Sequence, residues 1–145
     1  MSDERPVDPV RGWVADHLRS YVESDGEEGH LWRGVPTLLL TTRGRRSGTL
    51  RRTPLIYGRD GEAYVVVASR GGTPEHPAWY LNLSAEPEVT IQVGSDVMRA
   101  YATTIDGDHW SDVWGQMAQI WPAYDDYQAK TSRQIPLVRL EVVTA

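Results

Sequence analysis

Five arginines gather in one short stretch of the chain and form its clearest candidate for chemistry. They lie within ten residues that hold no acidic side chain, at Arg43, Arg45, Arg46, Arg51 and Arg52. The planar guanidinium group matches phosphate and carboxylate oxygens in two-point contacts. Gly48, next to Ser47, lets the backbone turn and aim its N–H groups at an anion. The stretch therefore predicts either a small-anion site or a hairpin turn with solvated arginines.

The charge of the whole chain indicates what kind of anion to expect. Fifteen Lys and Arg stand against twenty Asp and Glu, which gives a net charge of −5. Proteins that bind nucleic acid usually spread positive charge over a whole basic face. One basic loop on an acidic body favours a small anionic ligand, and no nucleic-acid partner is expected.

Several other kinds of site lack the residues they need. The four histidines, at positions 17, 30, 76 and 109, are far apart and show no ligand spacing, so no metal site is expected. Cysteine is absent, which excludes thiol catalysis and disulfides and is typical of the cytoplasm. No serine sits in a nucleophile elbow, and no glycine-rich nucleotide loop follows a predicted strand.

The chain length and hydrophobic periodicity predict one domain over residues 1–145. Apolar residues make up 40% of the chain, and their spacing switches between the helical and the strand period. We expect helices over 10–22, 77–83 and 110–120, and another that begins at residue 122. Asp106 or Asp108 is the expected cap of the helix over 110–120. Strands are expected over 37–42, 51–57, 63–69, 88–93, 97–105 and 135–143. The sequential antiparallel strands indicate an α+β domain around a small barrel. The continuously apolar strand over 63–69 is expected to be central.

The amphipathic N-terminal segment, residues 1–23, raises the question of membrane contact. Neither a transmembrane segment nor a signal peptide is expected from the sequence. Arg11 and Arg19 are offset by Asp8, Asp16 and Glu23, whereas interfacial helices usually carry a more basic face. Peripheral membrane contact is therefore not expected, and this helix should pack on the barrel or cover the mouth of a pocket.

Four motifs in fixed order carry a resemblance to a known family. They are residues 38–48 with Arg51 and residues 54–55, then residues 66–72, 76–83 and 121–128. Together they resemble the deazaflavin-dependent nitroreductase and quinone reductase family, which uses coenzyme F420. The resemblance runs over residues 34–143 and leaves out the N-terminal helix.

The resemblance implies a split β-barrel, related to flavin reductases, with about six mainly antiparallel strands. It also implies a cofactor with a planar deazaflavin at one end and a phosphate-linked, glutamate-bearing tail at the other. The implied tail-binding residues are Arg45, Arg46, Ser47, Gly48 and Arg51. The implied residues around the ring are Pro54, Leu55, Ile56, Ala68, Ser69, Arg70, Trp79 and Asn82.

The sequence departs from the family pattern at two places. Arg70 stands where a lysine is frequent, and Trp121 replaces the first of three aromatic hydroxyls near the C-terminal helix. The remaining two, Tyr124 and Tyr127, sit one helical turn apart and so are able to face one pocket. They are the candidate catalytic residues, with Tyr124 the better candidate to hydrogen-bond an acceptor oxygen.

The implied function is transfer of a hydride from the reduced deazaflavin to a quinone, enone or nitro-type acceptor. The alternative is a split-barrel protein that binds FMN, or that sequesters a deazaflavin without reducing anything. A third reading is a partner-binding module built on the aromatic C-terminal helix. The chain is expected to act as a monomer or a homodimer.

Overall fold

The computed structural model of the protein describes residues 12–24, 26–27, 30–32 and 35–143. Seven strands and four α-helices follow one another along them. The strands are β1 (Leu31–Trp32), β2 (Val35–Arg43), β3 (Leu50–Asp60), β4 (Ala63–Val67), β5 (Glu88–Val93), β6 (Asp96–Ile105) and β7 (Leu137–Val142). The helices are α1 (Gly12–Glu23), α2 (Ala78–Ala85), α3 (Gly107–Ile120) and α4 (Ala123–Ala129), with a short 3-10 turn, η1 (Arg70–Gly72).

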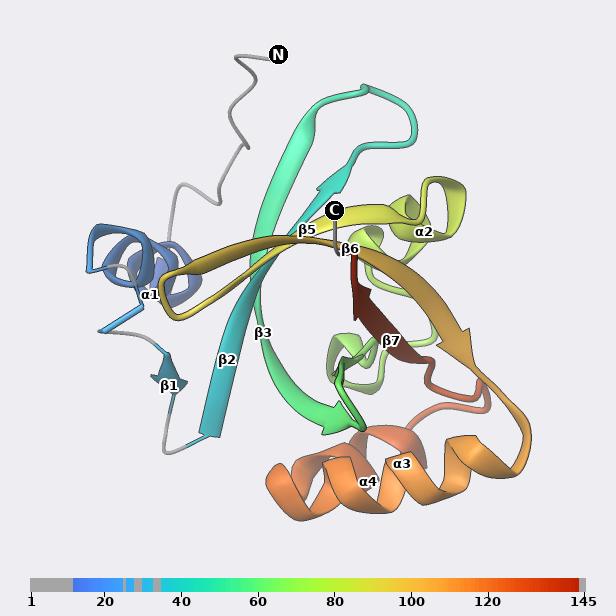
Figure 1. The fold of residues 1–145 in the computed structure, drawn as a ribbon. Coiled ribbons are helices and arrows are strands. Elements are labelled where there is room, and N and C mark those ends of the chain that lie inside the picture. Colours follow the sequence, from blue (N-terminus) through green and yellow to red (C-terminus); the bar gives the residue numbers. More distant parts are fainter. Residues whose placement is uncertain (1–11, 25, 28–29, 33–34, 144–145) are drawn as a thin grey trace.

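Six of the strands close into an antiparallel barrel (Figure 1). The sheet order is β1-β2-β3-β4-β7-β6-β5, and pairing of β2 with β5 joins its two sides. In that closing pair Leu40 lies opposite Ile91, and Leu39 lies opposite Gln92. Closure leaves few unpaired strand edges. The antiparallel split barrel expected from the sequence is confirmed.

Strands β2 and β4 have apolar residues at successive positions because both faces of each strand are covered by other parts of the protein. In β2, Leu38 and Leu40 pack inside the barrel, whereas Leu39 packs outward against α1. In β4, Val66 points inward, whereas Val65 and Val67 pack against α3 and α4. Each fully buried aliphatic side chain contributes about 1.5–3 kcal/mol. Strand β4 lies between β3 and β7, in agreement with its expected central place.

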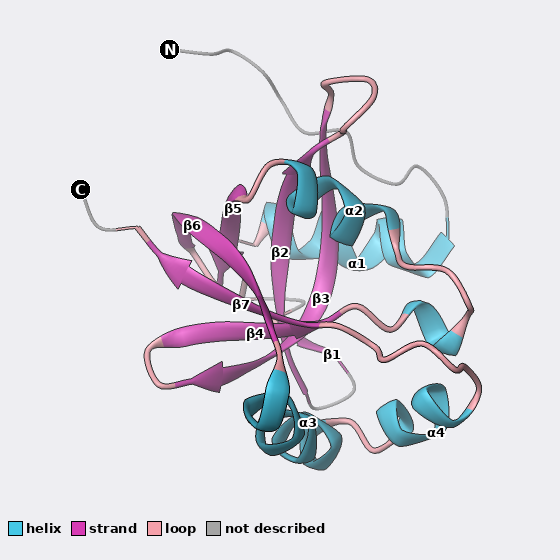
Figure 2. Ribbon diagram, turned by 90° about the vertical axis from the view of Figure 1, so that its right-hand side faces the viewer, coloured by secondary structure: helices cyan, strands magenta, loops and turns pink. Residues whose placement is uncertain are grey.

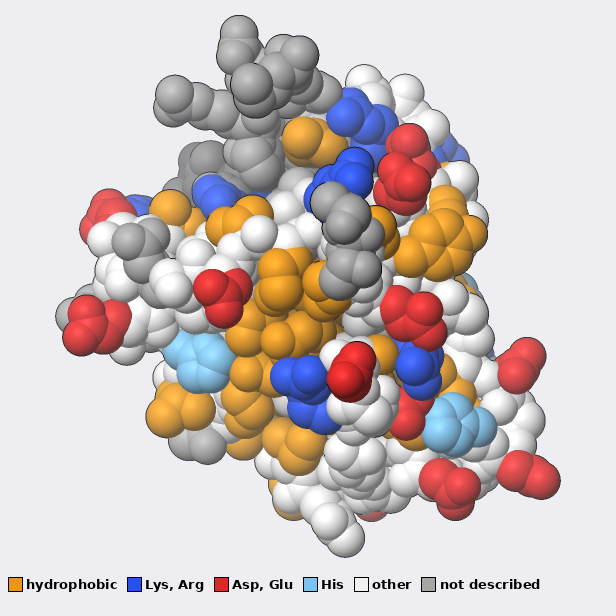
Figure 3. All heavy atoms as spheres, viewed as in Figure 1, with side chains coloured by type: hydrophobic (Ala, Val, Ile, Leu, Met, Phe, Trp, Pro, Cys, Tyr) orange, Lys and Arg blue, Asp and Glu red, His pale blue; other side chains and the backbone are white. Residues whose placement is uncertain are grey.

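The helices cover different parts of the barrel. Figure 1 shows α1 on one side and α3 with α4 together on another, while α2 lies close to the projecting β2–β3 turn in Figure 2. Apolar side chains gather over the middle of the face in Figure 3, and basic side chains are visible at the β2–β3 turn. No helix in the described part of the chain is long and apolar enough to cross a membrane.

The observed boundaries differ from the expected ones in ways that have local causes. Strand β4 ends at Val67 rather than at residue 69 because Ser69 already has helical backbone angles and is the N-cap of η1. Asp106 occupies the N-cap position of α3, but its side chain makes no capping hydrogen bond. The two-residue strand β1 was not expected, since so short a segment has no periodicity. The helix expected over 10–22 is seen as α1 from Gly12, since residues 10 and 11 lie outside the described residues.

Candidate active site

The arginine-rich stretch forms the turn between β2 and β3. A cavity of about 570 Å³ opens there, which we call the arginine cavity; it is lined by Arg43, Gly44, Arg45, Arg46, Ser47, Gly48, Ala85 and Glu86. The turn is closed by hydrogen bonds from Gly48 N–H to the Gly44 carbonyl (2.9 Å) and from Arg43 Nη1 to the Gly48 carbonyl (2.7 Å). Gly48 has φ +72°, which favours glycine. Arg45 and Arg46 are exposed.

Asn82 of α2 fixes the position of this turn through hydrogen bonds. Its Oδ1 accepts hydrogen bonds from the Arg45 backbone N–H (3.2 Å) and from Arg45 Nη1 (3.0 Å), and its Nδ2 donates to Thr42 Oγ1 (3.4 Å). The residue is only 4% exposed and lines neither of the cavities described here. Asn82 therefore braces Arg45, a contact between residues 37 positions apart.

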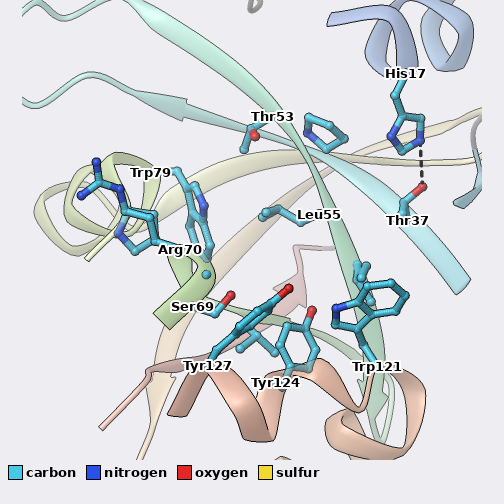
Figure 4. A pocket seen from close by; sticks show the side chains of 15 residues that line it. His17, Thr37, Thr53, Leu55, Ser69, Arg70, Trp79, Trp121, Tyr124 and Tyr127 are labelled. Carbon is cyan, nitrogen blue, oxygen red and sulfur yellow. Dashed lines mark hydrogen bonds between the residues drawn. The ribbon is translucent and has the colours of Figure 1, made fainter. Parts of the chain in front are cut away.

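A second cavity, of about 600 Å³, lies between β3, η1, α2 and α4 (Figure 4). We call it the aromatic cavity. Eight of the expected site residues line it: Pro54, Leu55, Ile56, Ser69, Arg70, Trp79, Tyr124 and Tyr127. The walls are mainly apolar and aromatic, with a few polar groups, as in sites for planar organic ligands. Helix α2 reaches both cavities, since Trp79 lines the aromatic one and Ala85 the arginine one.

Tyr124 and Tyr127 face the aromatic cavity together. Their ring centroids lie 6.1 Å apart with an interplanar angle of 71°, and both hydroxyls point toward the cavity in Figure 4. Tyr124 is 5% exposed, and this burial raises its pKa above the ordinary value, with the neighbouring Tyr127 adding to the effect. Within the described part of the chain neither hydroxyl has a hydrogen-bond partner. Both hydroxyls are therefore available to hydrogen-bond a ligand in this cavity.

Helix α3 fixes the position of Tyr124 from behind. The Trp114 ring lies 6.2 Å from the Tyr124 ring, and Trp114 Nε1 donates to Asp125 Oδ1 (2.8 Å). Trp110 stacks on Trp114 at 5.0 Å and donates to the Ile135 carbonyl (2.9 Å). Trp114 therefore links α3 to α4 at Asp125, and Trp110 links α3 to the segment before β7.

Residues 69–72 form a tight loop against α4. Arg70 has φ +45°, and Gly71 and Gly72 follow with φ +64° and +82°. A side chain at Gly72 would overlap the Tyr127 backbone, so the loop lies directly on the helix. Ser69, Arg70 and Gly71 line the cavity, and Arg70 pairs with Glu75 at 3.1 Å.

Two expected site residues besides Asn82 lie outside both linings. Arg51 is exposed on β3, opposite Thr42. Ala68 is fully buried, with its N–H bonded to the Pro136 carbonyl (2.9 Å). The structure thus brings twelve of the fifteen expected residues into two cavities.

Sequence reasoning missed two residues that belong to this region, His17 and Arg133, and it named Trp121 only as a departure from the family pattern. His17 of α1 lines the aromatic cavity, with Nε2 3.5 Å from Thr37 Oγ1, and Trp121 lines the same cavity. Arg133 holds the loop at Ser69 from behind. The sequence did contain a signal for the position of His17. This residue lies four residues before Tyr21 and so shares the helix face that packs against β2. As expected, α1 packs on the barrel, and His17 makes it part of the cavity wall.

A closed antiparallel barrel with an aromatic cavity defines a split-barrel protein of the flavin-reductase type. The chain belongs to the F420H(2)-dependent quinone reductase family, because the sequence model of that family matches residues 13–142. The match includes α1, which the motifs left out. The family identified from the four motifs is confirmed, and the protein is an oxidoreductase whose hydride donor is reduced coenzyme F420.

Individual relatives agree with this assignment. An F420H(2)-dependent quinone reductase of Mycobacterium tuberculosis (strain H37Rv) is 40% identical over 133 residues, which cover 86% of each chain. A solved F420-H2 dependent reductase, FDR-A, is 38% identical and superposes with a TM-score of 0.68 over 73% of this chain and 94% of its own. Another solved structure, described as a domain-swapped dimer, is 34% identical with a TM-score of 0.70, covering 87% and 98%.

Proposed function

We propose that this reductase transfers a hydride to a quinone, an enone or a nitro-type acceptor bound in the aromatic cavity. The observation that supports this most strongly is the pair of phenols at Tyr124 and Tyr127, which have no hydrogen-bond partner among the described residues and share that cavity with the loop at Ser69. Electrophilic acceptors of this kind develop negative charge on oxygen when they are reduced. Hydrogen-bond donors aimed at that oxygen stabilise the transition state more than the ground state.

The two cavities fit the two ends of the cofactor. A planar deazaflavin needs apolar walls, which Pro54, Leu55 and Trp79 supply. An anionic tail needs positive charge and N–H donors, which Arg45, Arg46 and the turn at Ser47–Gly48 supply. Helix α2 has eight residues and so extends over about 12 Å between the two regions. We assign the ring to the aromatic cavity and the tail to the arginine cavity.

The remaining expected residues take indirect roles in this proposal. Asn82 holds Arg45 in place, and Ala68 anchors the loop that leads to Ser69 and Arg70. Arg51 lies on β3 close to the turn and adds positive charge near the tail without lining its cavity. Unlike these three residues, Ile56 lines the aromatic cavity directly and completes its apolar wall on β3.

The reduced deazaflavin supplies the hydride, with its two electrons, from C5. The protein supplies orientation and hydrogen bonds. Burial raises the pKa of Tyr124, so its hydroxyl keeps its proton and donates a hydrogen bond to the acceptor oxygen as charge develops there. Tyr127, one turn further along α4, is the second donor. Trp121 provides a flat apolar wall where a third hydroxyl is absent, which favours quinones and enones over nitroimidazoles.

The test is a titration of the purified protein with coenzyme F420 and, separately, with FMN, followed by mixing the reduced complex with a quinone. We expect saturable binding of F420, weak binding of FMN, and oxidation of the bound cofactor by the quinone. Preferred binding of FMN would contradict the proposal. Tight binding of F420 with no oxidation by any quinone, enone or nitro compound would instead indicate a sequestering protein.

The proposal includes a homodimer working in the cytoplasm. Val97, Tyr101 and Val143 are 65%, 49% and 43% exposed. They share the outer face of β6 and β7, since Val143 bonds to the Arg99 carbonyl and alternate residues of a strand point to one side. A solved relative is described as a domain-swapped dimer. Light scattering should give twice the monomer mass, and a Tyr101→Glu change should halve it.

A further inference from the structure

Arg133 stands outside both cavities, in the connection between α4 and β7, yet it reaches the loop that borders the aromatic cavity. Its Nε donates to the Thr73 carbonyl (2.9 Å) and its Nη2 to the Ser69 carbonyl (2.8 Å). Its Nη1 donates to the Ala68 carbonyl (3.2 Å) and to His76 Nδ1 (3.1 Å). One guanidinium group thus binds four acceptors across residues 68–76.

Arg133 is itself held from α4. Gln128 Nε2 donates to the Arg133 carbonyl (2.7 Å), and Gln128 Oε1 accepts from the Ile135 N–H (2.9 Å). The Arg133 N–H also reaches Thr131 Oγ1 (3.3 Å). The side chain therefore ties the loop to the helix that carries Tyr124 and Tyr127.

The loop needs such an anchor because its backbone is unusual. Arg70 has a left-handed conformation at φ +45°, which a non-glycine residue keeps only when its surroundings hold it there. Both flanks of this residue are fixed, by Arg133 at Ser69 and by the contact of Gly72 with the Tyr127 backbone. Loss of Arg133 would free the side of the loop that faces the cavity.

We propose that Arg133 is a positioning residue that holds the ring-side loop (residues 68–73) and the tyrosines of α4 in one fixed geometry. The proposal rests on the function proposed above, in which the loop meets the ring of the cofactor and α4 meets the acceptor. Hydride transfer depends steeply on the alignment of donor and acceptor. Arg133 contacts neither the cofactor nor the acceptor. It acts through the ring-side loop, which meets the ring, and through α4, which meets the acceptor.

The planar fork of arginine is required for this role. Four acceptors lie around one guanidinium plane, and a lysine ammonium has three donors at a single point. Arg133→Lys keeps the charge but loses most of the bridge. Arg133→Ala removes both the charge and the bridging hydrogen bonds. It also leaves a space of the size that a free guanidinium ion fills.

The first measurement uses the protein without cofactor. In Arg133→Ala we expect the pKa of His76, followed by NMR, to rise, because the positive charge of Arg133 adds to burial in lowering it. An unchanged pKa would mean that Arg133 does not hold His76 in solution, which would contradict the arrangement.

The second measurement uses the deazaflavin chromophore without its tail. In Arg133→Ala we expect its affinity to fall about 10-fold and turnover with a quinone to fall about 100-fold, as for a misplacement of about 1 Å. The KM for the quinone should change much less. Millimolar guanidinium should restore turnover, whereas sodium at equal ionic strength should not. If Arg133→Ala fails to fold, Arg133→Lys takes its place and should show a smaller loss of the same kind.

The matched control is Arg139→Ala. Arg139 pairs with Asp60 and Glu141 on the outside of the barrel, and its loss should leave chromophore affinity unchanged. Wild-type affinity and turnover in a folded Arg133 variant would overturn the inference. Failure of the wild-type protein to bind the chromophore would instead overturn the proposed function, so the two failures are distinguishable.

Discussion

The arginine cavity and the aromatic cavity are built in opposite ways. Arg45 and Arg46 are exposed, and the turn that carries them is closed largely by bonds within residues 43–49. Tyr124 is 5% exposed, and its cavity is assembled from β3, α2, α4 and the loop at Ser69. We propose that charge on the local turn recognises one end of the cofactor, and that the shape of the cavity formed by distant segments recognises the other.

The difference assigns separate tasks to the two regions. Exposed arginines attract anions over a distance and tolerate some motion, because charge is not strongly directional. A buried phenol works only when its oxygen is correctly placed. Changes in the arginine cavity should therefore alter affinity for the tail of the cofactor, while changes at the aromatic cavity should alter turnover or the binding of the ring and the acceptor.

The largest effect is expected at Tyr124. The Tyr124→Phe change removes the hydroxyl and keeps the ring, so turnover should fall about 100-fold or more while cofactor affinity stays near wild type. Steady-state kinetics with several quinones, together with a binding titration, measures both quantities. Tyr127→Phe is the control one turn away, with a smaller loss expected. Wild-type turnover in Tyr124→Phe would mean that another group stabilises the charge on the acceptor oxygen.

The next effect is expected at Arg46. A charge-assisted hydrogen bond contributes about 1.5–3 kcal/mol, so Arg46→Ala should weaken binding of the full cofactor about 10- to 100-fold. Turnover at saturating cofactor should be unaffected. Arg51→Ala, outside the cavity lining, should cost less. A fall in turnover without a fall in affinity in Arg46→Ala would contradict the proposal that the arginine cavity serves binding and the aromatic cavity serves turnover.

A smaller effect is expected at His17, which lines the aromatic cavity from α1. One neutral hydrogen bond contributes about 0.5–1.5 kcal/mol, so His17→Ala should raise the KM for a quinone about 3- to 10-fold. Arg19→Ala serves as the control on the same helix, since Arg19 pairs with Asp16 at the surface. An unchanged KM in His17→Ala would mean that α1 does not contact the acceptor.

The smallest effect concerns pH. Burial, with the charge of Arg133 second, lowers the pKa of His76, whose Nδ1 accepts from Arg133. Tyr80 packs on its ring, and the Arg70–Glu75 pair lies beside it. A lowered histidine pKa means that the stabilisation is present above pH about 6.5 and is lost as pH falls through the pKa of the folded state.

Urea unfolding at a series of pH values tests this prediction. Protonation of His76 should cost the wild-type protein about one hydrogen bond, or about 0.5–1.5 kcal/mol. His76→Gln should lack this part of the pH dependence, which separates it from the titration of the other histidines. Identical pH profiles for the two proteins would contradict the assignment.

The same contrast explains what the sequence made predictable. Strand β5 was expected at its observed bounds, Glu88–Val93, because alternation is a local signal. The arginine turn was evident for the same reason. Arg133 was not, because its bonds join residues 57 to 65 positions apart, and the space between them exists only once the barrel has closed. Asn82 was expected at the ring but holds Arg45, since position in a motif does not indicate which way a side chain points.

Salt dependence of binding tests most directly the claim that charge holds one end of the cofactor and shape the other. The affinities of wild-type protein for the full cofactor and for the chromophore without its tail are compared as ionic strength rises from about 0.01 M to about 1 M, which shortens the screening length from about 30 Å to about 3 Å. We predict that the full cofactor binds more tightly at low salt and loses this advantage as salt rises, while chromophore affinity stays nearly constant. Equal affinities at low salt, or a parallel decline of both, would contradict the account.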